Sequence, residues 1–286
     1  IRDDMVSRGL EMCIRDSTLT APIPEKSLGE VHREIDRLLQ QIDTSLSTWR
    51  YDSLATKLNQ ADAYTPIQLD FHLTNILTIA EELSEQTQGQ FDITAAPLIQ
   101  WWHQFINAAS TSNKLKPAAA PTDVMNLIGF KNLMIKKPID SDYPLVQKTH
   151  ANVAIDLSGI GAGYAVDQIG EHLVSIGSSS HLVELGGEVR AWGQPSPSRK
   201  WLVTIRETKN MPSQVISLDH GQALAVSTTL PEKPIVDPTT GRLLEFPTRG
   251  YAVVAYAPTC AEADALATSY VIDAIKKKKQ DRKTPD

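Results

Sequence analysis

The sequence has few cysteines, no long apolar run and no excess of positive charge, and each shortage excludes a class of protein. Its two cysteines, Cys13 and Cys260, exclude a disulfide framework and give no paired-cysteine metal site. No apolar run approaches the roughly 18 residues of a membrane-spanning helix. With 34 acidic and 28 basic residues the chain carries a net charge of −6. It therefore lacks the basic excess typical of a nucleic-acid-binding protein.

The 286 residues are 41% hydrophobic and 22% charged, which is ordinary for a globular chain of one large or two small domains. The charge is unevenly spread. Residues 276–286 carry six bases and two acids, whereas the remainder carries 22 bases and 32 acids. We expect 276–286 to be a basic, solvated C-terminal tail, since a nucleic-acid or membrane tail usually has more bases or an aromatic partner.

The first 17 residues show no sustained period and no turn that links them to the next segment. We expect a non-native or disordered leader over 1–17 and a single domain over 18–275. The N-terminus also lacks the apolar stretch of a signal peptide. If the leader is foreign to the protein, that absence carries no information about the compartment.

The hydrophobic spacing predicts an α+β fold, because helices dominate the first half and strands mixed with two helices the second. A Ser27–Glu30 capping box opens the first helix. A small-residue, proline-rich loop is expected at 108–121. The predicted helices cover 27–43, 67–88, a segment after Asp92, 160–176 and 261–275. The predicted strands cover 131–136, 152–156, 181–185, 188–193, 201–206, 214–218, 223–227 and 251–257.

A glycine-rich segment, IDLSGIGAGYAVD at 155–167, is the first candidate for chemistry. A short strand is expected to end at Asp156, and Gly159, Gly161 and Gly163 lead into a helix. Glycines let a ligand approach the backbone, and a helix N-terminus attracts phosphate. The alternative is a turn that only permits tight packing of a helix on a strand. The segment by itself does not decide between the two.

The last predicted helix carries a second candidate, because Asp264 and Thr268 are four residues apart and share one helix face. A carboxylate and a hydroxyl, joined by a carbonyl from another loop, suit a hard cation such as Mg²⁺. Alternatively, Asp264 is a first-turn acid favoured by the helix dipole and Thr268 faces solvent.

Two further features have simple structural explanations beside the functional ones. Asp92 either caps a helix or belongs to a ligand-binding turn. Trp49 either fills the core or stacks on a flat ring. In addition, the turn at 238–241, after Asp237, is a loop able to close over a site. The seven histidines show no metal-binding spacing, no nucleophile elbow or P-loop occurs, and Cys260 has no evident base partner.

Taken together, seven segments resemble the blocks of the ApbE family, the FAD:protein FMN transferases. In order they are STWRYDSLATKLN, FDITAAPL, IDLSGIGAGYAVD, LVELGGEVRAWG, AVSTT, IVDPTTG and APTCAEADALAT, and they span about residues 30–275. Each is weak alone, but seven in the right order are specific. The resemblance implies an α+β, T-fold-related domain of mixed antiparallel sheets with flanking helices.

The family transfers the FMN half of FAD to a Thr or Ser hydroxyl of a target flavoprotein, releases AMP and requires Mg²⁺. By resemblance, the side chains of Asp264 and Thr268 and the carbonyl of Gly159 bind Mg²⁺. The remaining implied residues surround FAD; they are Trp49, Gln90, Phe91, Asp92, Asp156 and Ala162. Many members carry Lys or Glu where this chain has Ala162, so one polar contact to FAD is expected to be missing.

Two departures from the family put full activity in doubt. The segment between AVSTT and the DPTTG turn is short, and Pro234 stands where the family has a histidine thought to assist transfer. Proline cannot act as an acid or base. His220 is a possible replacement, and no residue is assigned as catalytic with certainty. The alternatives are therefore a catalytically impaired FAD-binding relative and an FAD pyrophosphatase, in which water replaces the protein hydroxyl. The family's N-terminal Met-Gly-Thr strand is also missing.

The resemblance also implies partners and a location. The acceptor is expected to be a flavoprotein subunit of a membrane redox complex, and no nucleic-acid partner is expected. The location implied is periplasmic or anchored to the inner membrane.

Overall fold

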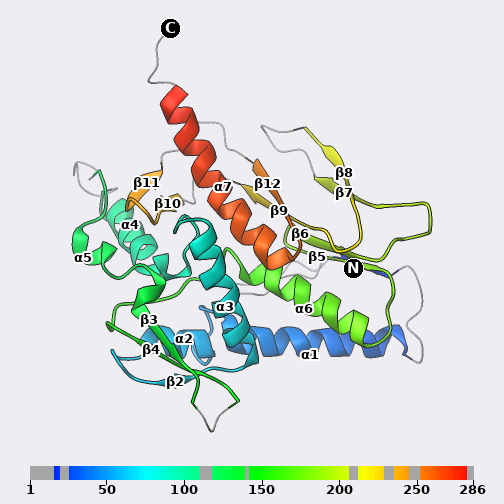
Figure 1. The fold of residues 1–286 in the computed structure, drawn as a ribbon, viewed down its shortest axis with the longest axis horizontal. Helices are drawn as coiled ribbons and strands as arrows, with labels where there is room; N and C mark the ends of the chain where they lie inside the picture. The colour runs from blue at the N-terminus through cyan, green and yellow to red at the C-terminus, as the bar shows by residue number, and fades with distance from the viewer. Residues whose placement is uncertain are drawn as a thin grey trace.

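A five-stranded antiparallel sheet, in the order β1-β5-β6-β9-β12, lies at the centre of the fold (Figure 1). The computed structural model describes residues 16–19, 26–109, 118–138, 142–205, 212–228, 235–244 and 252–281. The strands of the sheet are β1 (Asp16–Leu19), β5 (His181–Leu185), β6 (Glu188–Trp192), β9 (Ala223–Thr228) and β12 (Ala252–Ala257). Helices α6 (Gly161–Ser175) and α7 (Cys260–Asp281) cover one face (Figure 1).

The two faces of this sheet belong to different cores. On β6, Val189 and Ala191 pack against the hairpin of β7 (Trp201–Ile205) and β8 (Gln214–Leu218). Because side chains alternate along a strand, the intervening residues point to the face that α6 and α7 cover. Trp192 accordingly belongs to the larger core, which those two helices share with α1 (Leu28–Leu46) and α3 (Phe71–Gln86). At the β5–β6 turn, Gly186 and Gly187 have φ of 70° and 124°, as a tight hairpin requires.

The N-terminal half is helical, as predicted. Helix α1 (Leu28–Leu46) begins with the expected capping box, in which Ser27 and Glu30 each bond the other's backbone N–H. The helix expected over 67–88 starts later, as α3 (Phe71–Gln86), because the Asp70 side chain caps it by accepting from the N–H of Leu73 at 2.8 Å. Helix α2 (Leu54–Gln60) was not predicted.

Short elements complete the fold. A three-stranded sheet has the order β2-β4-β3, and β10 pairs with β11. Helix α4 follows a 3₁₀ turn, and a second 3₁₀ turn precedes β3. The bounds are β2 (Ile67–Gln68), β3 (Leu133–Lys136), β4 (Leu145–Lys148), β10 (Ile235–Asp237), β11 (Arg242–Leu244), η1 (Ile93–Ala95), η2 (Phe130–Asn132), α4 (Ala96–Ala109) and α5 (Thr122–Met125). Most of the expected 108–121 loop lies outside the described residues.

The strand expected over 152–156 is wrong, because these residues form no strand in the described structure. The side chain of Asn59, at the end of α2, replaces a strand partner. Its amide donates to the carbonyl of Ile155 at 2.9 Å, and its oxygen accepts from the N–H of Ile155 at 2.7 Å. One side-chain amide therefore satisfies both backbone groups that a neighbouring strand would have bonded.

The expected ends of the domain also need correction. Asp16 and Ser17 open β1 and pair with Glu184 and Val183 of β5, so the expected boundary between residues 17 and 18 falls inside a strand. The remaining leader residues, 1–15, lie outside the described residues. At the other end, α7 runs to Asp281, and the expected tail therefore begins as part of a helix.

Helices α6 and α7 cross at backbone contact. A Cβ atom built on Gly163 would lie 2.1 Å from the carbonyl oxygen of Cys260, so only glycine fits. Each helix also supplies a carboxylate to the start of the other. Asp167 accepts from the N–H groups of Cys260 and Ala261, both at 2.9 Å, and Asp264 accepts from the N–H of Gly163 at 3.2 Å. The crossing thus satisfies N–H groups that a helix start leaves without intrahelical partners.

We predict that Gly163→Ala destabilises the protein by about 3 kcal/mol, because the new methyl group must displace backbone rather than a flexible side chain. The matched control is Gly29→Ala in α1, where the added Cβ would meet only Arg33 at 3.6 Å. There the free energy of unfolding should stay constant or rise by up to about 1 kcal/mol. Urea unfolding monitored by circular dichroism measures both. Equal effects of the two substitutions would contradict the close crossing.

Candidate functional site

The three residues proposed for a cation meet where the glycine-rich loop reaches α7. A Cβ built on Gly159 would lie 3.1 Å from Thr268 Oγ1 and 3.5 Å from the ring of Phe91. Asp264 lies one turn before Thr268 on α7, and the Thr268 hydroxyl donates to its carbonyl at 3.3 Å. The glycine-rich loop and α7, which are far apart in the sequence, therefore contribute residues to the same place, as expected.

Asp264 is a buried acid in an unfavourable environment. Its side chain accepts one hydrogen bond, from the N–H of Gly163, and the residue is 7% exposed. Burial and then the nearby Glu188 carboxylate raise its pKa well above the usual range, while that hydrogen bond opposes the rise. The alternative that Asp264 is a first-turn acid favoured by the helix dipole is wrong, because the acid in the first turn of α7 is Glu262.

The donor set fits a hard cation. One carboxylate, one hydroxyl and one backbone carbonyl are all oxygen ligands, and Mg²⁺ is typically held by one or two carboxylates together with water and phosphate. A cation at this point would also stabilise the ionised form of a carboxylate that burial otherwise disfavours. Within the described residues no group of three His, Cys, Asp or Glu side chains could hold a metal. A site rich in histidine or thiolate is therefore not formed by that part of the chain.

Gln90, Phe91 and Asp92 form the turn that leads into η1, next to this place. Phe91 is buried against Gly159. The Gln90 side-chain amide donates to Asp273 of α7 at 2.9 Å, which fixes the turn to the helix that carries Thr268. Asp92 caps η1 by accepting from the N–H and the hydroxyl of Thr94 at 2.8 and 2.6 Å. Burial raises the pKa of Asp92 despite these bonds.

Asp156 is held beside the same turn. Its N–H donates to the carbonyl of Ile93 at 2.7 Å, and its carboxylate accepts from the N–H of Ser158 at 2.9 Å. The first bond joins the glycine-rich loop to η1, and the second shapes the bend before Gly159. Gly159, Asp156 and the 90–92 turn are consequently held together by the backbone bond to Ile93 and by the packing of Phe91 on Gly159.

Two predicted residues stand apart from these contacts. Ala162 lies half-buried in the first turn of α6 and offers only a methyl group. Trp49 lies in the turn between α1 and α2 and is 75% exposed, so the explanation that it fills the core is wrong. No hydrogen bond or ring contact joins Trp49 to the other predicted residues within the part of the chain that the structure describes.

The 237–241 turn, whose role the sequence left open, is fixed by Asp237. This carboxylate is 1% exposed and accepts from the hydroxyls of Thr239 and Thr240, both at 2.7 Å, and from Lys276 of α7 at 2.9 Å. A Cβ on Gly89 would lie 3.8 Å from Thr239, so the turn adjoins the residues that precede Gln90. Sequence reasoning missed Lys276, which we had assigned to a solvated tail.

Two residues bear on the role of the family histidine, Pro234 and His220. Pro234 and the rest of 229–234 lie outside the described residues. His220, the possible replacement, accepts from the N–H of Gly193 at its Nδ1 atom, at 2.8 Å. A neutral ring bonded in this way carries its own proton on Nε2 and has no second lone pair for another. His220 is therefore not arranged as a general base.

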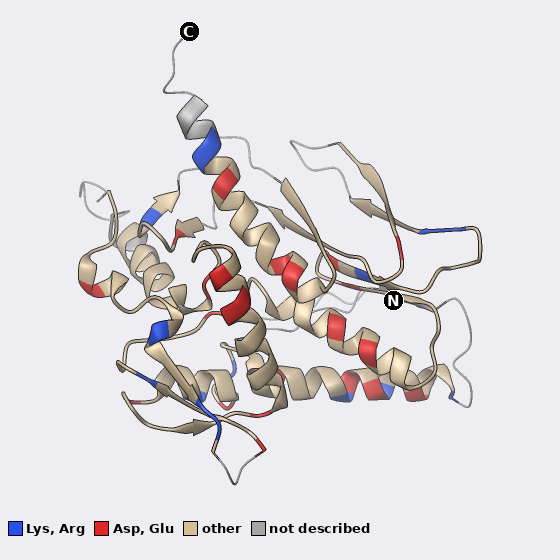
Figure 2. Ribbon diagram, viewed as in Figure 1, with Lys and Arg blue, Asp and Glu red and all other residues tan. Residues whose placement is uncertain are grey.

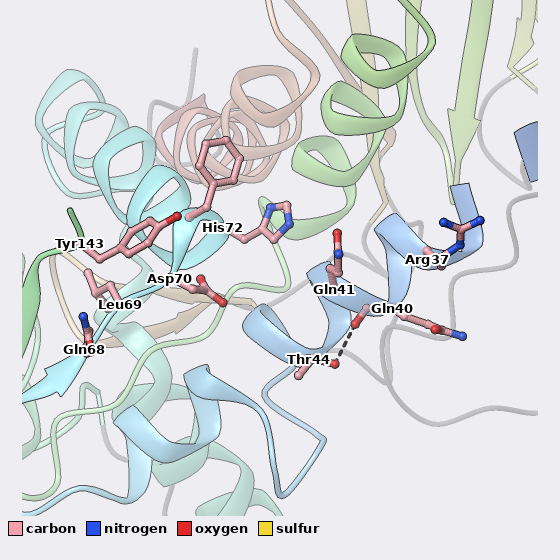
Figure 3. Close-up of a pocket in the computed structure, with 10 residues that line it drawn as sticks. Arg37, Gln40, Gln41, Thr44, Gln68, Leu69, Asp70, His72 and Tyr143 are labelled. Carbon is pink, nitrogen blue, oxygen red and sulfur yellow. Dashed lines mark hydrogen bonds between the residues drawn. The ribbon is translucent and has the colours of Figure 1, made fainter. Parts of the chain in front are cut away.

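A separate cavity of about 850 Å³ lies between α1 and the start of α3 (Figure 3). Its lining includes Arg37, Gln41, Asp70, His72 and Tyr143, and none of the predicted site residues. It has one indirect link to the glycine-rich segment, because His72 Nδ1 lies 3.0 Å from the hydroxyl of Tyr164 on α6. Its volume alone does not make it the site.

Acidic residues occur on α6 and α7, and also on α1 and α3, whereas a basic segment marks the far end of α7 (Figure 2). The fold and the donor set therefore define an α+β protein in which three candidate oxygen ligands lie at the junction of a glycine-rich loop and a helix.

Comparison with known proteins identifies the family. The ApbE family model matches residues 14–281, and the chain belongs to the ApbE family. It is 27% identical over 256 residues to the FAD:protein FMN transferase of Vibrio cholerae, covering 84% of this chain and 72% of that protein. It is 26% identical to the enzyme of the same name from Escherichia coli K12, over 90% of this chain and 75% of that protein.

Solved structures confirm the predicted α+β, ApbE-like fold. The flavin transferase ApbE from Vibrio cholerae matches with a TM-score of 0.68 at 26% identity, covering 87% of this chain and 80% of that one. The flavinyl transferase ApbE from Pseudomonas stutzeri matches with a TM-score of 0.68 at 25% identity, covering 86% and 76%.

We predict that Lys276→Met lowers the free energy of unfolding by about 1–3 kcal/mol at pH 7, because the buried Asp237 loses its cation. The matched control is Lys277→Met, which changes the exposed neighbouring lysine and should have little effect on the free energy of unfolding. Denaturant unfolding at several pH values measures both.

The ion pair of Lys276 and Asp237 also predicts how the free energy of unfolding depends on pH. Burial opposes ionisation of Asp237, but hydrogen bonds from Thr239, Thr240 and Lys276 outweigh it and lower its pKa. Stability from a lowered carboxyl pKa is present above the unfolded value of about 3.9 and is lost as pH falls through the folded value. The effect of Lys276→Met should therefore shrink below about pH 4. A constant effect at every pH would contradict this account.

Proposed function

We propose that the protein is a Mg²⁺-dependent transferase that moves the FMN half of FAD onto a Thr or Ser hydroxyl of a target flavoprotein and releases AMP. The observation that carries the proposal is the contact of Gly159 with Thr268, one helical turn after the buried carboxylate of Asp264. Family membership and relatives named FAD:protein FMN transferase support the same activity.

In the proposed reaction the acceptor oxygen forms a bond to the FMN phosphorus. The bond between that phosphorus and the bridging pyrophosphate oxygen breaks, AMP leaves with this oxygen, and the acceptor loses its hydroxyl proton. Asp264, Thr268 and the Gly159 carbonyl would hold Mg²⁺. When bound, the ion neutralises pyrophosphate charge and stabilises the negative charge that develops on the leaving AMP.

The chain's own residues bind and orient the substrate. The N-terminal end of α6, directly after the glycine-rich loop, presents a positive dipole end to phosphate. The Gln90–Asp92 turn and Asp156 lie beside it and are proposed to line the FAD site. Trp49, exposed on its turn, is free to stack on the flavin ring. Holding both partners in line supplies much of the acceleration in such a transfer.

We also propose, from the family resemblance, that the acceptor is a flavoprotein subunit of a membrane redox complex and that transfer occurs on the periplasmic side of the inner membrane. No described helix is long and apolar enough to cross a membrane. Flavin fluorescence of membrane proteins from cells with and without this gene tests the proposal. Labelling of only cytoplasmic proteins would contradict it.

We predict that Asp264→Asn lowers the rate of flavin transfer by at least about 100-fold, because it removes the only carboxylate among the three proposed ligands. The purified protein is incubated with FAD, Mg²⁺ and a target that carries the family's acceptor motif. In-gel flavin fluorescence and AMP release are both measured. The matched control is Glu262→Gln on the same helix, which should retain the wild-type rate.

The two readouts separate the candidate functions. Labelled target with equal AMP supports the transferase. Free FMN and AMP without labelled target indicate an FAD pyrophosphatase. Stoichiometric binding of intact FAD, without AMP, indicates an impaired relative, which the replacement of the family histidine by Pro234 motivates. Either of the last two results, obtained with folded protein and a competent target, overturns the proposal.

A further inference from the structure

One residue beside the proposed cation site has no assigned role. Glu188 opens β6 and, by alternation along the strand, points to the same face as Arg190 and Trp192. That face is covered by α6 and α7, and two contacts fix the position of β6 against α6. Trp192 fills the space above Gly170, where a Cβ would lie 2.0 Å from its ring, and Arg190 donates to Asp167 at 2.7 Å.

These two contacts indicate where Glu188 lies. Trp192 contacts Gly170 of α6, and Arg190, two residues earlier on β6, contacts Asp167, three residues earlier on α6. One further step along β6 leads toward the first turn of α6, where the N–H of Gly163 donates to Asp264. The Glu188 side chain is folded back at the hairpin turn, since a Cβ on Gly186 would lie 3.1 Å from its Oε2.

The charges around Glu188 agree with this position. Burial raises its pKa to about 7, its own backbone hydrogen bond opposes the rise, and the Glu184 carboxylate adds to it. The Glu188 carboxylate in turn adds to the rise in the pKa of Asp264, which agrees with the place on β6 that the contacts of Trp192 and Arg190 give it.

No positive side chain compensates this pair in the described ranges. Arg190, the nearest candidate along β6, forms its ion pair with Asp167 and lies 3.8 Å from Glu171. Two half-buried or buried carboxylates without a counter-charge are unfavourable, whereas a divalent cation neutralises both. The number of charged groups around a cation is also what tunes its affinity.

We propose that Glu188 is a positioning residue of the cation site, supplying the second carboxylate that gives this site its affinity for a divalent ion. The assignment rests on the proposed function and deepens it. Glu188 acts on the ion through its charge beside Asp264, and the ligands themselves remain Asp264, Thr268 and Gly159.

The test measures metal binding without catalysis. Mn²⁺ is titrated into the full-length protein without FAD, and free Mn²⁺ is followed by its electron paramagnetic resonance signal. Glu188→Gln should weaken Mn²⁺ binding by about 10- to 100-fold, as loss of groups around a metal site commonly does. Glu188→Asp, which keeps the charge on a shorter side chain, should recover a large part of the affinity.

The hairpin offers a matched control. Glu184 carries the same charge on β5 but lies opposite Val189 and points to the other face of the sheet. Glu184→Gln should leave Mn²⁺ affinity within about threefold of wild type, because it removes an equal charge without touching the helix face. Thermal unfolding with and without Mn²⁺ gives a second measure, in which the metal-dependent rise in melting temperature should be smallest for Glu188→Gln.

Each outcome decides something. Wild-type affinity in a folded Glu188→Gln variant overturns the assignment, and so does equal weakening by Glu184→Gln. Failure of Glu188→Asp to recover any affinity also overturns it, because that result indicates a steric role. If the wild-type protein binds no Mn²⁺, the cation site of the proposed function itself fails. Normal Mn²⁺ binding with no flavin transfer instead leaves the role of Glu188 intact and removes only the proposed reaction.

Discussion

The close crossing of α6 and α7 is the constraint on which the rest of the structure depends. At Gly163 the two backbones touch, and Asp167 and Asp264 each reach across to the start of the opposite helix. The contact brings residues about 100 positions apart in sequence into one place. Asp264 bonds across the crossing and is also one of the proposed ligands. Helix packing therefore fixes the position of this ligand.

This arrangement has an electrostatic cost that a bound cation would offset. The acidic body of the chain, the burial of Asp264 and the position of Glu188 all disfavour negative charge at the crossing. Yet the family's substrate is itself an anion. A cation at the crossing would favour the ionised form of these carboxylates and would also offset the negative charge of such a substrate.

Sequence reasoning recovered the fold class and most long elements because periodic patterns and capping boxes are local signals, as at Ser27 and Glu30. It failed where a distant side chain decided the structure. The side chain of Asn59 takes the place of a neighbouring strand beside Ile155. Lys276, which was expected in a solvated tail, forms an ion pair with Asp237. Strands of two or three residues, such as β2 and β10, carry too little pattern to detect. Gly159 and Thr268 were paired by family resemblance, since no spacing rule links them.

The clamp that Asn59 places on Ile155 affects more than the local backbone. In a ladder, a neighbouring strand would engage every second carbonyl of the glycine-rich segment, and sheet extension would compete with a ligand for the same acceptors. The side-chain amide of Asn59 bonds the backbone groups of one residue only, because a side chain has no further backbone to continue the ladder. Beyond this clamp the segment is held by other bonds, since the N–H of Asp156 donates to Ile93 and the carbonyl of Leu157 accepts from the N–H of Gly161. Its path into α6 is therefore set by separate side-chain and turn contacts rather than by a ladder.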